Sequence, residues 1–251
     1  MGYYMCPIYC INNERRNYTM PKFNIISVGT NAKTVKSDKG GEYLTAIIYL
    51  APADMVEGMN VCAMAIMAGC KFGCLFSAGR GAFNSVQQSR IRKTILLRDN
   101  PEEFHDLLRQ DLIKFQEYCL KKGVVPVVRP NGTSDINYRN FAREFPNIQF
   151  YDYTKVYNRV AKDLPENYHL TISYSEANKD YTKKAVEYAN KYGVNLAVVF
   201  RKKELPETFL GRPVINGDKD DLRFLDPKNV IVGLYAKGKA KKDTSGFVID
   251  N

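Results

Sequence analysis

Residues 124–135, VVPVVRPNGTSD, form an apolar run that ends in a group of small and polar residues. Runs this short and this rich in β-branched residues are typical of strands that are buried on both faces of a parallel sheet. Similar apolar runs recur further along the chain at 147–154, 168–175, 194–201 and 229–236. We therefore predict five parallel strands in this half of the protein.

Helical segments separate these strands, and one more strand precedes them. The run YLTAIIYL at Tyr43–Leu50 is the additional strand, and a helical region in two pieces follows at about 85–122. Asn100 is the predicted N-cap of the second piece, and Gly123 ends it. Another helix is predicted over 178–192. Strands that alternate with helices indicate an α/β protein, either a β/α barrel or a doubly wound sheet.

Polar residues favour the barrel, because they gather just after the carboxyl ends of the strands, which form the catalytic face of a β/α barrel. These residues are Arg129, Asn131, Ser134, Asp135, Asp152, Lys155, Ser173, Ser175, Glu176 and Arg201. We predict a single-domain, partial TIM-like β/α barrel with mostly parallel strands over 20–236. Residues 1–19 are expected to be a non-native or flexible extension, and 237–251 a basic C-terminal tail.

Three cysteines lie in the predicted loop 60–81, which is rich in glycine, alanine and methionine. Cys62, Cys70 and Cys74 have the spacing C-x7-C-x3-C. Three thiolates can hold an iron–sulfur cluster and leave one coordination position open, so a 4Fe–4S cluster is the predicted cofactor. Zinc is an alternative, although a structural zinc site needs a fourth ligand, which an N-terminal cysteine would have to supply. Three buried thiols in a metal-free helix of small residues are the other alternative.

This arrangement resembles the radical S-adenosylmethionine enzymes, in which three cysteines after the first strand of a partial barrel bind a 4Fe–4S cluster. The cysteine spacing in that superfamily is C-x3-C-x2-C, so this chain departs from the pattern. The resemblance implies that residues at the ends of the second and fourth strands bind S-adenosylmethionine. By position these residues are Asn131, Gly132, Thr133, Ser173 and Ser175.

Longer strings of sequence resemble a family of bacteriophage proteins, the gene product eighty-eight type. The strings include YLAPADMVEGMNVC, GCKFGCLFSAGRGAFNSVQ, RPNGTSDI and DLRFLDP, and the resemblance begins near residue 24. It implies a phage origin and no particular activity. The cysteines are too sparse for a secreted disulfide framework, and no apolar run is long enough to span a bilayer. We therefore expect a protein of the cytoplasm of the infected bacterium, without a membrane partner.

The formal net charge is +10 and the sequence pI is about 9.2, which favours an anionic partner such as a nucleotide or nucleic acid. A basic group beside the cysteines is the predicted phosphate site, because it accompanies a glycine-rich turn and the start of a helix. Its members are Lys71, Arg80, Arg90, Arg92 and Lys93. A solvated helix face is the alternative explanation for this group, and a solvated tail is the alternative for the C-terminal lysines.

Carboxylates at strand ends are the candidates for acid–base catalysis. Asp135 is a candidate general base, with a helix-capping turn as the alternative. Asp152 with Lys155 is a candidate acid–base pair or a plain salt bridge. The segment 217–227, GDKDDLRFLDP, lacks the spacing of a calcium loop and is expected to be an ion-pair loop.

The leading functional prediction is an iron–sulfur enzyme, radical S-adenosylmethionine-like or diverged, that acts on a nucleotide or nucleic acid. The alternative is a non-catalytic nucleic-acid-binding protein with a structural zinc or iron–sulfur site. Salt-dependent binding of DNA by a colourless protein would favour the alternative.

Overall fold

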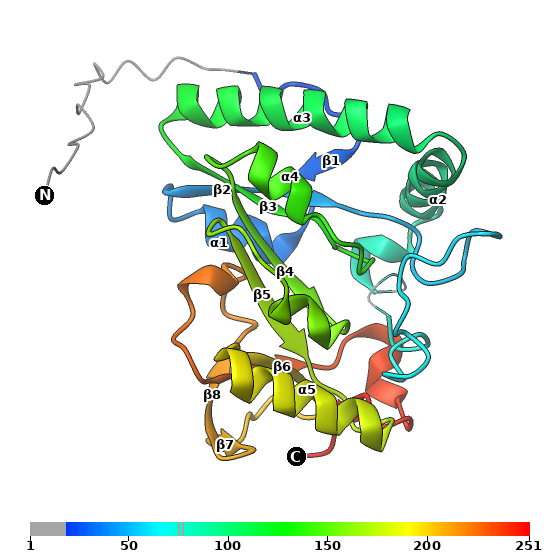
Figure 1. Cartoon of the computed structure of the whole chain (residues 1–251), viewed down its shortest axis with the longest axis vertical. Coiled ribbons are helices and arrows are strands. Elements are labelled where there is room, and N and C mark those ends of the chain that lie inside the picture. Colours follow the sequence, from blue (N-terminus) through cyan, green and yellow to red (C-terminus); the bar gives the residue numbers. More distant parts are fainter. Residues whose placement is uncertain (1–18, 75, 77) are drawn as a thin grey trace, which may run out of the picture.

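The computed structural model describes residues 19–74, 76 and 78–251, and this part of the chain forms one open, mostly parallel sheet of ten strands (Figure 1). The strands lie in the order β1-β2-β3-β4-β5-β6-β9-β8-β7, and β10 pairs with β6. Their bounds are β1 Ile26–Val28, β2 Tyr43–Ile48, β3 Val125–Arg129, β4 Gln149–Thr154, β5 Tyr168–Ser173, β6 Leu196–Phe200, β7 Thr208–Phe209, β8 Arg212–Asn216, β9 Ile231–Tyr235 and β10 Val248–Ile249. The six predicted strands are β2, β3, β4, β5, β6 and β9, so the α/β prediction is confirmed.

Helices cover one face of this sheet. The main hydrophobic core joins buried residues of α3 (Pro101–Lys122), α4 (Arg139–Glu144) and α5 (Lys179–Tyr192) to alternate residues of the strands, such as Ala46 and Ile48. Since successive strand residues point to opposite faces, these alternate positions define a single covered face. In Figure 1, α3 runs beside β1 and α5 runs beside β6, at opposite ends of the sheet.

The helix ends follow from local side-chain chemistry. Asn100 caps α3 by accepting a hydrogen bond from the Glu103 N–H at 3.2 Å, and Asn178 caps α5 in the same way. Gly123 and Gly193 end these helices with φ of 67° and 63°, a backbone conformation that glycine adopts without steric cost. The predicted two-piece helical region is also confirmed, since α2 (Asn84–Asp99) ends where α3 begins.

The opposite face of the sheet is covered by α1 (Ala32–Asp38) and by the aspartate-rich segment 217–227. Leu222 of this segment packs on Val127 of β3 and Tyr151 of β4 in a small separate core. These two strand residues alternate with those that face the helices, so the segment covers the second face of the sheet at β3 and β4.

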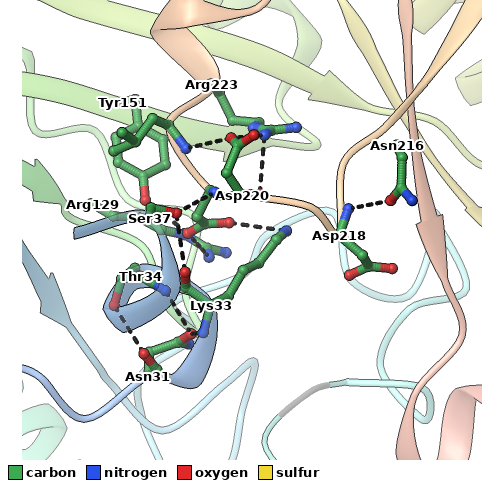
Figure 2. A network of polar contacts seen from close by, with 12 residues as sticks. Asn31, Lys33, Thr34, Ser37, Arg129, Tyr151, Asn216, Asp218, Asp220 and Arg223 are labelled. Carbon is green, nitrogen blue, oxygen red and sulfur yellow. Dashed lines mark hydrogen bonds and ion pairs between the residues drawn. The ribbon is translucent and has the colours of Figure 1, made fainter. Parts of the chain in front are cut away.

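Asp221 is the centre of a buried polar network on this second face. Its carboxylate contacts the Lys33 Nζ at 3.1 Å and the Arg129 Nη1 at 3.1 Å, and accepts a hydrogen bond from the Tyr151 hydroxyl at 2.7 Å. Its backbone N–H donates to the Ser37 Oγ at 2.9 Å. Figure 2 shows Lys33, Arg129 and Tyr151 converging from α1, β3 and β4. The prediction of an ion-pair loop over 217–227 is therefore confirmed.

Several short elements were not expected from the sequence. β1 pairs antiparallel with β2 at one edge, and β8 pairs parallel with β9 near the other. At the lysine-rich end, the 3-10 turn η5 (Gly238–Lys242) leads to β10, which pairs parallel with β6 and is buried. The C-terminal segment is thus tied to the sheet by β10 and by the buried Ala240 and Phe247, while its lysines are exposed.

Two further expectations concern the chain ends and membranes. The expected N-terminal extension over 1–19 lies outside the described residues except for residue 19. Among the helices that the structure describes, none is both long and apolar enough to cross a membrane.

Candidate metal centre

The cysteines lie between β2 and α2, in a segment that the structure builds from consecutive turns. Short-range backbone bonds join the Ala65 N–H to the Cys62 oxygen at 3.0 Å and the Ala68 N–H to the Met64 oxygen at 2.9 Å. Gly69 then redirects the chain with a φ of 65°. The alternative of a small-residue helix through the cysteines is therefore wrong.

Side chains at the ends of β3 and β5 anchor this cysteine loop. The Thr133 hydroxyl donates to the Leu50 oxygen at 2.6 Å, where the loop leaves β2. The Ser175 hydroxyl donates to the Ala68 oxygen at 2.8 Å, within the loop itself. Thr133 and Ser175 were predicted to bind S-adenosylmethionine. In the structure their hydroxyls hold the cysteine loop against the carboxyl edge of the sheet.

Gly69 is a point at which the cysteine loop packs closely on the rest of the protein. The Ser245 hydroxyl donates to the Gly69 oxygen at 3.1 Å. A Cβ at this position would collide with the Ser245 side chain and would lie 2.7 Å from the Ala177 Cβ. The loop is therefore packed backbone-to-side-chain against two other segments.

We expect Gly69→Ala to lower the free energy of unfolding by about 1–3 kcal/mol through overpacking, in addition to the cost of its positive φ. Gly29→Ala is the matched control, because Gly29 has a φ of 68° and a methyl group added there would meet no atom within 4 Å. Urea unfolding of both variants measures the difference. Equal losses would show that Gly69 is a backbone requirement and not a packing contact.

The three cysteine thiols are partly buried, and two of them point towards backbone carbonyls. Cys62 Sγ lies 3.7 Å from the Thr133 oxygen, and Cys70 Sγ lies 3.7 Å from the Ala65 oxygen. Cys62, Cys70 and Cys74 are all of intermediate exposure. Within the described ranges, no three His, Cys, Asp or Glu side chains are gathered closely enough to hold a metal ion.

The three thiols influence one another electrostatically, although they are not gathered as metal ligands in the described structure. The pKa of Cys62 is raised to about 12, chiefly by burial, with smaller contributions from Cys74 and Cys70. Burial also raises the pKa of Cys74; Cys70 adds to this shift, while Lys155 and Arg90 oppose it. The Cys62 and Cys74 thiols are therefore protonated at neutral pH, and two cationic side chains, Lys155 and Arg90, act on Cys74 electrostatically.

Lys155 is one of these cations, and it reaches the site from the end of β4. Its Nζ donates to the Ser173 hydroxyl at 2.7 Å and lies 4.8 Å from the centre of the Phe247 ring. The structure therefore brings together two residues that sequence analysis assigned to different roles, catalysis for Lys155 and cofactor binding for Ser173.

Arg90 is the other cation, and it turns inward from α2. Its guanidinium lies 4.6 Å from the centre of the Tyr49 ring and 5.4 Å from that of Phe76. The Thr94 hydroxyl donates to the Arg90 backbone oxygen at 2.9 Å and accepts from the N–H of Ala51 at 2.8 Å, which fixes this turn of α2 against the chain leaving β2.

The rest of the predicted basic group is divided rather than gathered at one phosphate site. Lys71 pairs with Asp54 at 2.9 Å. Lys93 donates to a backbone oxygen next to β1 at 2.7 Å, and burial lowers its pKa to about 8. Arg80 and Arg92 are exposed. Arg90 is thus the member of the group that is directed to the cysteines.

Asp135 serves as a hydrogen-bond acceptor for the chain that follows β4. It accepts from the Thr154 hydroxyl at 2.8 Å, from the Lys155 N–H at 2.7 Å and from the Val156 N–H at 3.3 Å. It also accepts from the Arg159 Nη1 at 2.7 Å. These contacts use both carboxylate oxygens and are typical of a structural turn.

Asp152 is fully buried beneath this turn. Asn131 Nδ2 donates to its carboxylate, the Tyr168 hydroxyl donates at 3.1 Å, and Arg159 Nη2 lies 3.6 Å away. Burial raises the pKa of Asp152 to about 6, and Arg159 limits the rise. The predicted pairing of Asp152 with Lys155 is wrong, because Lys155 extends to Ser173 instead.

Asn131 and Gly132 shape the loop after β3. The Asn131 Oδ1 accepts from the Ser134 hydroxyl at 2.7 Å and from the Ile136 N–H at 2.9 Å. Gly132 is packed on the Tyr49 ring so closely that a Cβ would overlap it. Asn131 therefore holds this loop together and also reaches Asp152 of β4. Gly132 allows the loop to pack on Tyr49.

Aromatic side chains around the site were missed by the sequence analysis. Tyr49 and Phe76 flank Arg90, and Phe247 flanks Lys155. The sequence signal for them was weak. Tyr49 lies at the end of the first predicted strand and Phe76 is two residues after Cys74, but the chain has 30 Tyr and Phe residues and nothing in the sequence singles these two out.

Comparison with known proteins identifies the family of this chain. A family model described as Gene product 88 matches residues 24–251. No curated protein and no solved structure matches the chain. The match covers nearly all of the strings that suggested a phage origin in the sequence. The chain belongs to the Gene product 88 family of bacteriophage proteins.

Proposed function

We propose that this protein is an iron–sulfur enzyme, with a cluster on Cys62, Cys70 and Cys74, that acts on a nucleotide or nucleic acid. The observation that carries the proposal is one loop with three cysteines and two cations beside it. Arg90 lies over the Phe76 ring, and Lys155 lies over the Phe247 ring, which packs against Gly73 of the loop. The cysteine loop is anchored by residues that follow β3 and β5. The site therefore lies at the carboxyl edge of a parallel sheet, where ligands of α/β proteins commonly bind.

The donor set fits a cluster with one open position better than a closed zinc site. A tetrahedral structural zinc needs four protein ligands. Asp135 also influences the pKa of Cys62, but its carboxylate is already bonded to four neighbouring groups. Among the described residues, no three His, Cys, Asp or Glu side chains are gathered as a closed ligand set. When bound, a cluster on three thiolates would supply an iron with a vacant coordination position.

The high thiol pKa values set a condition for assembly. Metal ligation requires thiolates, and the metal itself drives their deprotonation. The carbonyl contacts of Cys62 and Cys70 would be given up when these side chains turn to a cluster. Lys155 and Arg90 would then offset part of the negative charge of the thiolates, because both already oppose the rise in the pKa of Cys74.

The finer architecture that we infer is an incomplete barrel. The strands β2, β3, β4, β5 and β6 are neighbours in sequence order and parallel, and β9 follows β6. This order differs from the reversal that defines a doubly wound sheet. In this proposal S-adenosylmethionine binds near Ser173 and Lys155, which bond to each other and not to the cysteine loop. The side-chain polar atoms of Asn131, Thr133 and Ser175 instead hold backbone groups of the chain.

Basic and aromatic residues around the site support a nucleotide or nucleic acid as the substrate. The η5 turn carries Lys239, Lys241 and Lys242 and packs against the cysteine loop, where Gly73 meets Ala240. Figure 1 shows the red C-terminal segment beside the cyan cysteine loop. Two exposed aromatic side chains, Phe72 and Phe83, are available for stacking on bases. We place this activity in the cytoplasm of the infected bacterium.

Metal analysis of protein purified without oxygen tests the proposal. We expect about four irons and four sulfides per chain with absorbance at about 400 nm, as for a 4Fe–4S cluster. The Cys62/Cys70/Cys74→Ala variant is expected to lose them. Cys119→Ala is the matched control, because Cys119 is buried in α3 and belongs to the main core. Stoichiometric zinc, or metal retained by the triple variant, would contradict the cluster.

A second function is favoured by the net charge of +10. A non-catalytic nucleic-acid-binding protein with structural zinc would bind oligonucleotides with an affinity that falls steeply with salt. It would contain zinc, and loss of the zinc would unfold the cysteine loop without removing any reaction.

A further inference from the structure

Arg90 stands apart from the other buried arginines of the described chain. Arg159 pairs with Asp135 at 2.7 Å, and Arg223 pairs with Asp220 at 2.7 Å. Arg212 donates to a backbone oxygen and an amide oxygen. Arg90 is 7% exposed, and its Nε and Nη1 are buried without a hydrogen-bond partner in the part of the protein that is described.

Burying a guanidinium without an anion or an acceptor is costly, on the order of several kcal/mol. The Tyr49 and Phe76 rings stabilise the cation through their faces, but they provide no acceptor for its N–H groups. The rings also hold the guanidinium in one orientation. The site is therefore prepared for an acceptor that does not come from the described residues.

Lys155 adds a second positive charge to the same place. The Lys155 Nζ lies 4.8 Å from the centre of the Phe247 ring, and this ring packs against Gly73, which precedes Cys74. The Arg90 guanidinium lies 5.4 Å from the centre of the ring of Phe76, two residues after Cys74, so both cations lie against residues next to this thiol in the chain. Lys155 donates to the neutral Ser173 hydroxyl, and no carboxylate of the described residues pairs with it. Lys155 and Cys74 are both of intermediate exposure, which leaves the group accessible from solvent.

We propose that Arg90 and Lys155 form an oxyanion-binding site beside Cys74 that receives a phosphate group of the nucleotide substrate. Guanidinium and ammonium groups are the usual partners of phosphate in proteins, through charge-assisted hydrogen bonds. The nucleotide rests on the proposed function, whereas the oxyanion site rests on the geometry of Arg90 and Lys155. If the inference holds, the phosphate is bound next to the position at which an open iron would lie.

Isothermal titration of metal-free, reduced protein with inorganic phosphate tests the site without the cluster. We expect saturable binding, at least tenfold weaker in Arg90→Gln and in Lys155→Gln, and unchanged in Arg92→Gln. Arg92 is the matched control because it loses the same charge from an exposed position two residues along α2. No binding to the wild-type protein, or equal weakening in Arg92→Gln, would overturn the site.

Four further titrations separate this inference from the proposed function. A nucleoside 5′-monophosphate is expected to bind more tightly than phosphate, and the corresponding nucleoside not to bind; binding of acetate as tight as that of phosphate would overturn the phosphate assignment. The Cys62/Cys70/Cys74→Ala variant is expected to keep phosphate binding. A protein that binds phosphate in this way but contains no iron would support the oxyanion site and contradict the cluster. A protein that contains the cluster but does not bind phosphate would contradict the oxyanion site and support the cluster.

Discussion

Replacement of Asp221 by alanine is expected to lower the free energy of unfolding by about 3–5 kcal/mol, the typical effect of removing one partner from a buried ion pair. The Asp221 side chain is fully buried and joins Lys33 of α1 to Arg129 of β3. Without it these two cations lose their carboxylate and the Tyr151 hydroxyl loses its acceptor. Urea unfolding followed by circular dichroism measures the change.

Asp163→Ala is the control for this substitution. Asp163 is 89% exposed and pairs with Arg143 at 2.7 Å on the surface. Exposed pairs of this kind contribute about 0–1 kcal/mol. If Asp221→Ala were no more destabilising than Asp163→Ala, the buried network would not be what holds the segment 217–227 on the sheet.

The pH dependence of stability is an independent test of the contacts that Asp221 makes with Arg129 and Lys33. Burial alone would raise the pKa of Asp221, but Arg129 and Lys33 outweigh it and hold the pKa at about 2, below its ordinary value of 3.8. The stabilisation is therefore present above about pH 3.8 and is lost as the pH falls towards 2. Asp152 and Asp226, whose pKa values are raised to about 6, act with the opposite sign between about pH 4 and 6. Comparison with Asp221→Ala across this range isolates the Asp221 contribution.

The second large effect is expected for Asp135→Ala, with a loss of about 3–5 kcal/mol. Asp135 is the acceptor for two backbone N–H groups after β4 and for the buried Arg159. Its removal leaves these donors without their present partner in a buried site. The Lys155 backbone is one of the groups released, so we also expect the Lys155 side chain to lose its fixed position at the cysteines.

Thermal and urea unfolding of Asp135→Ala and Asp135→Asn check this expectation. Asparagine keeps one oxygen acceptor, so its effect is expected to be smaller than that of alanine. A stable Asp135→Ala protein that had lost only a catalytic step would contradict the structural role and return Asp135 to the position of a general base.

The sequence was sufficient for the parallel strands and the long helices because each carries a strong local signal. The run at 124–130 is apolar except for Arg129 and becomes β3, in which Val127 and Val128 are buried on opposite faces. The cap Asn100 and the terminator Gly123 fix α3 through hydrogen bonds and a backbone conformation that depend on neighbouring residues alone. Such signals do not require knowledge of the tertiary structure.

The parts that escaped prediction depend on distant contacts. β10 has two residues and follows a lysine-rich stretch, so its pairing with β6 leaves almost no pattern in the sequence. The same holds at the site: the inward direction of Arg90 is set by Tyr49 and Phe76, and that of Lys155 by Ser173. Residue type and spacing identified the cysteines and their basic neighbours. Tertiary packing determines which of these cations is buried, as Arg90 is, and which is exposed, as Arg92 is, so the sequence alone did not predict it.

The pairing of β10 with β6 also dictates when the cysteine site can be finished during synthesis. The cysteine loop is made early, yet one of its contacts comes from Ser245, and Gly246 accepts a hydrogen bond from the Glu176 N–H at 2.8 Å. These residues are brought into place by Val248 and Ile249, which add to the sheet beside β6. A ribosome must therefore translate some 170 codons beyond Cys74 before the thiols acquire their full enclosure. Until then the cysteine loop of the growing chain lacks the contacts that the C-terminal segment supplies.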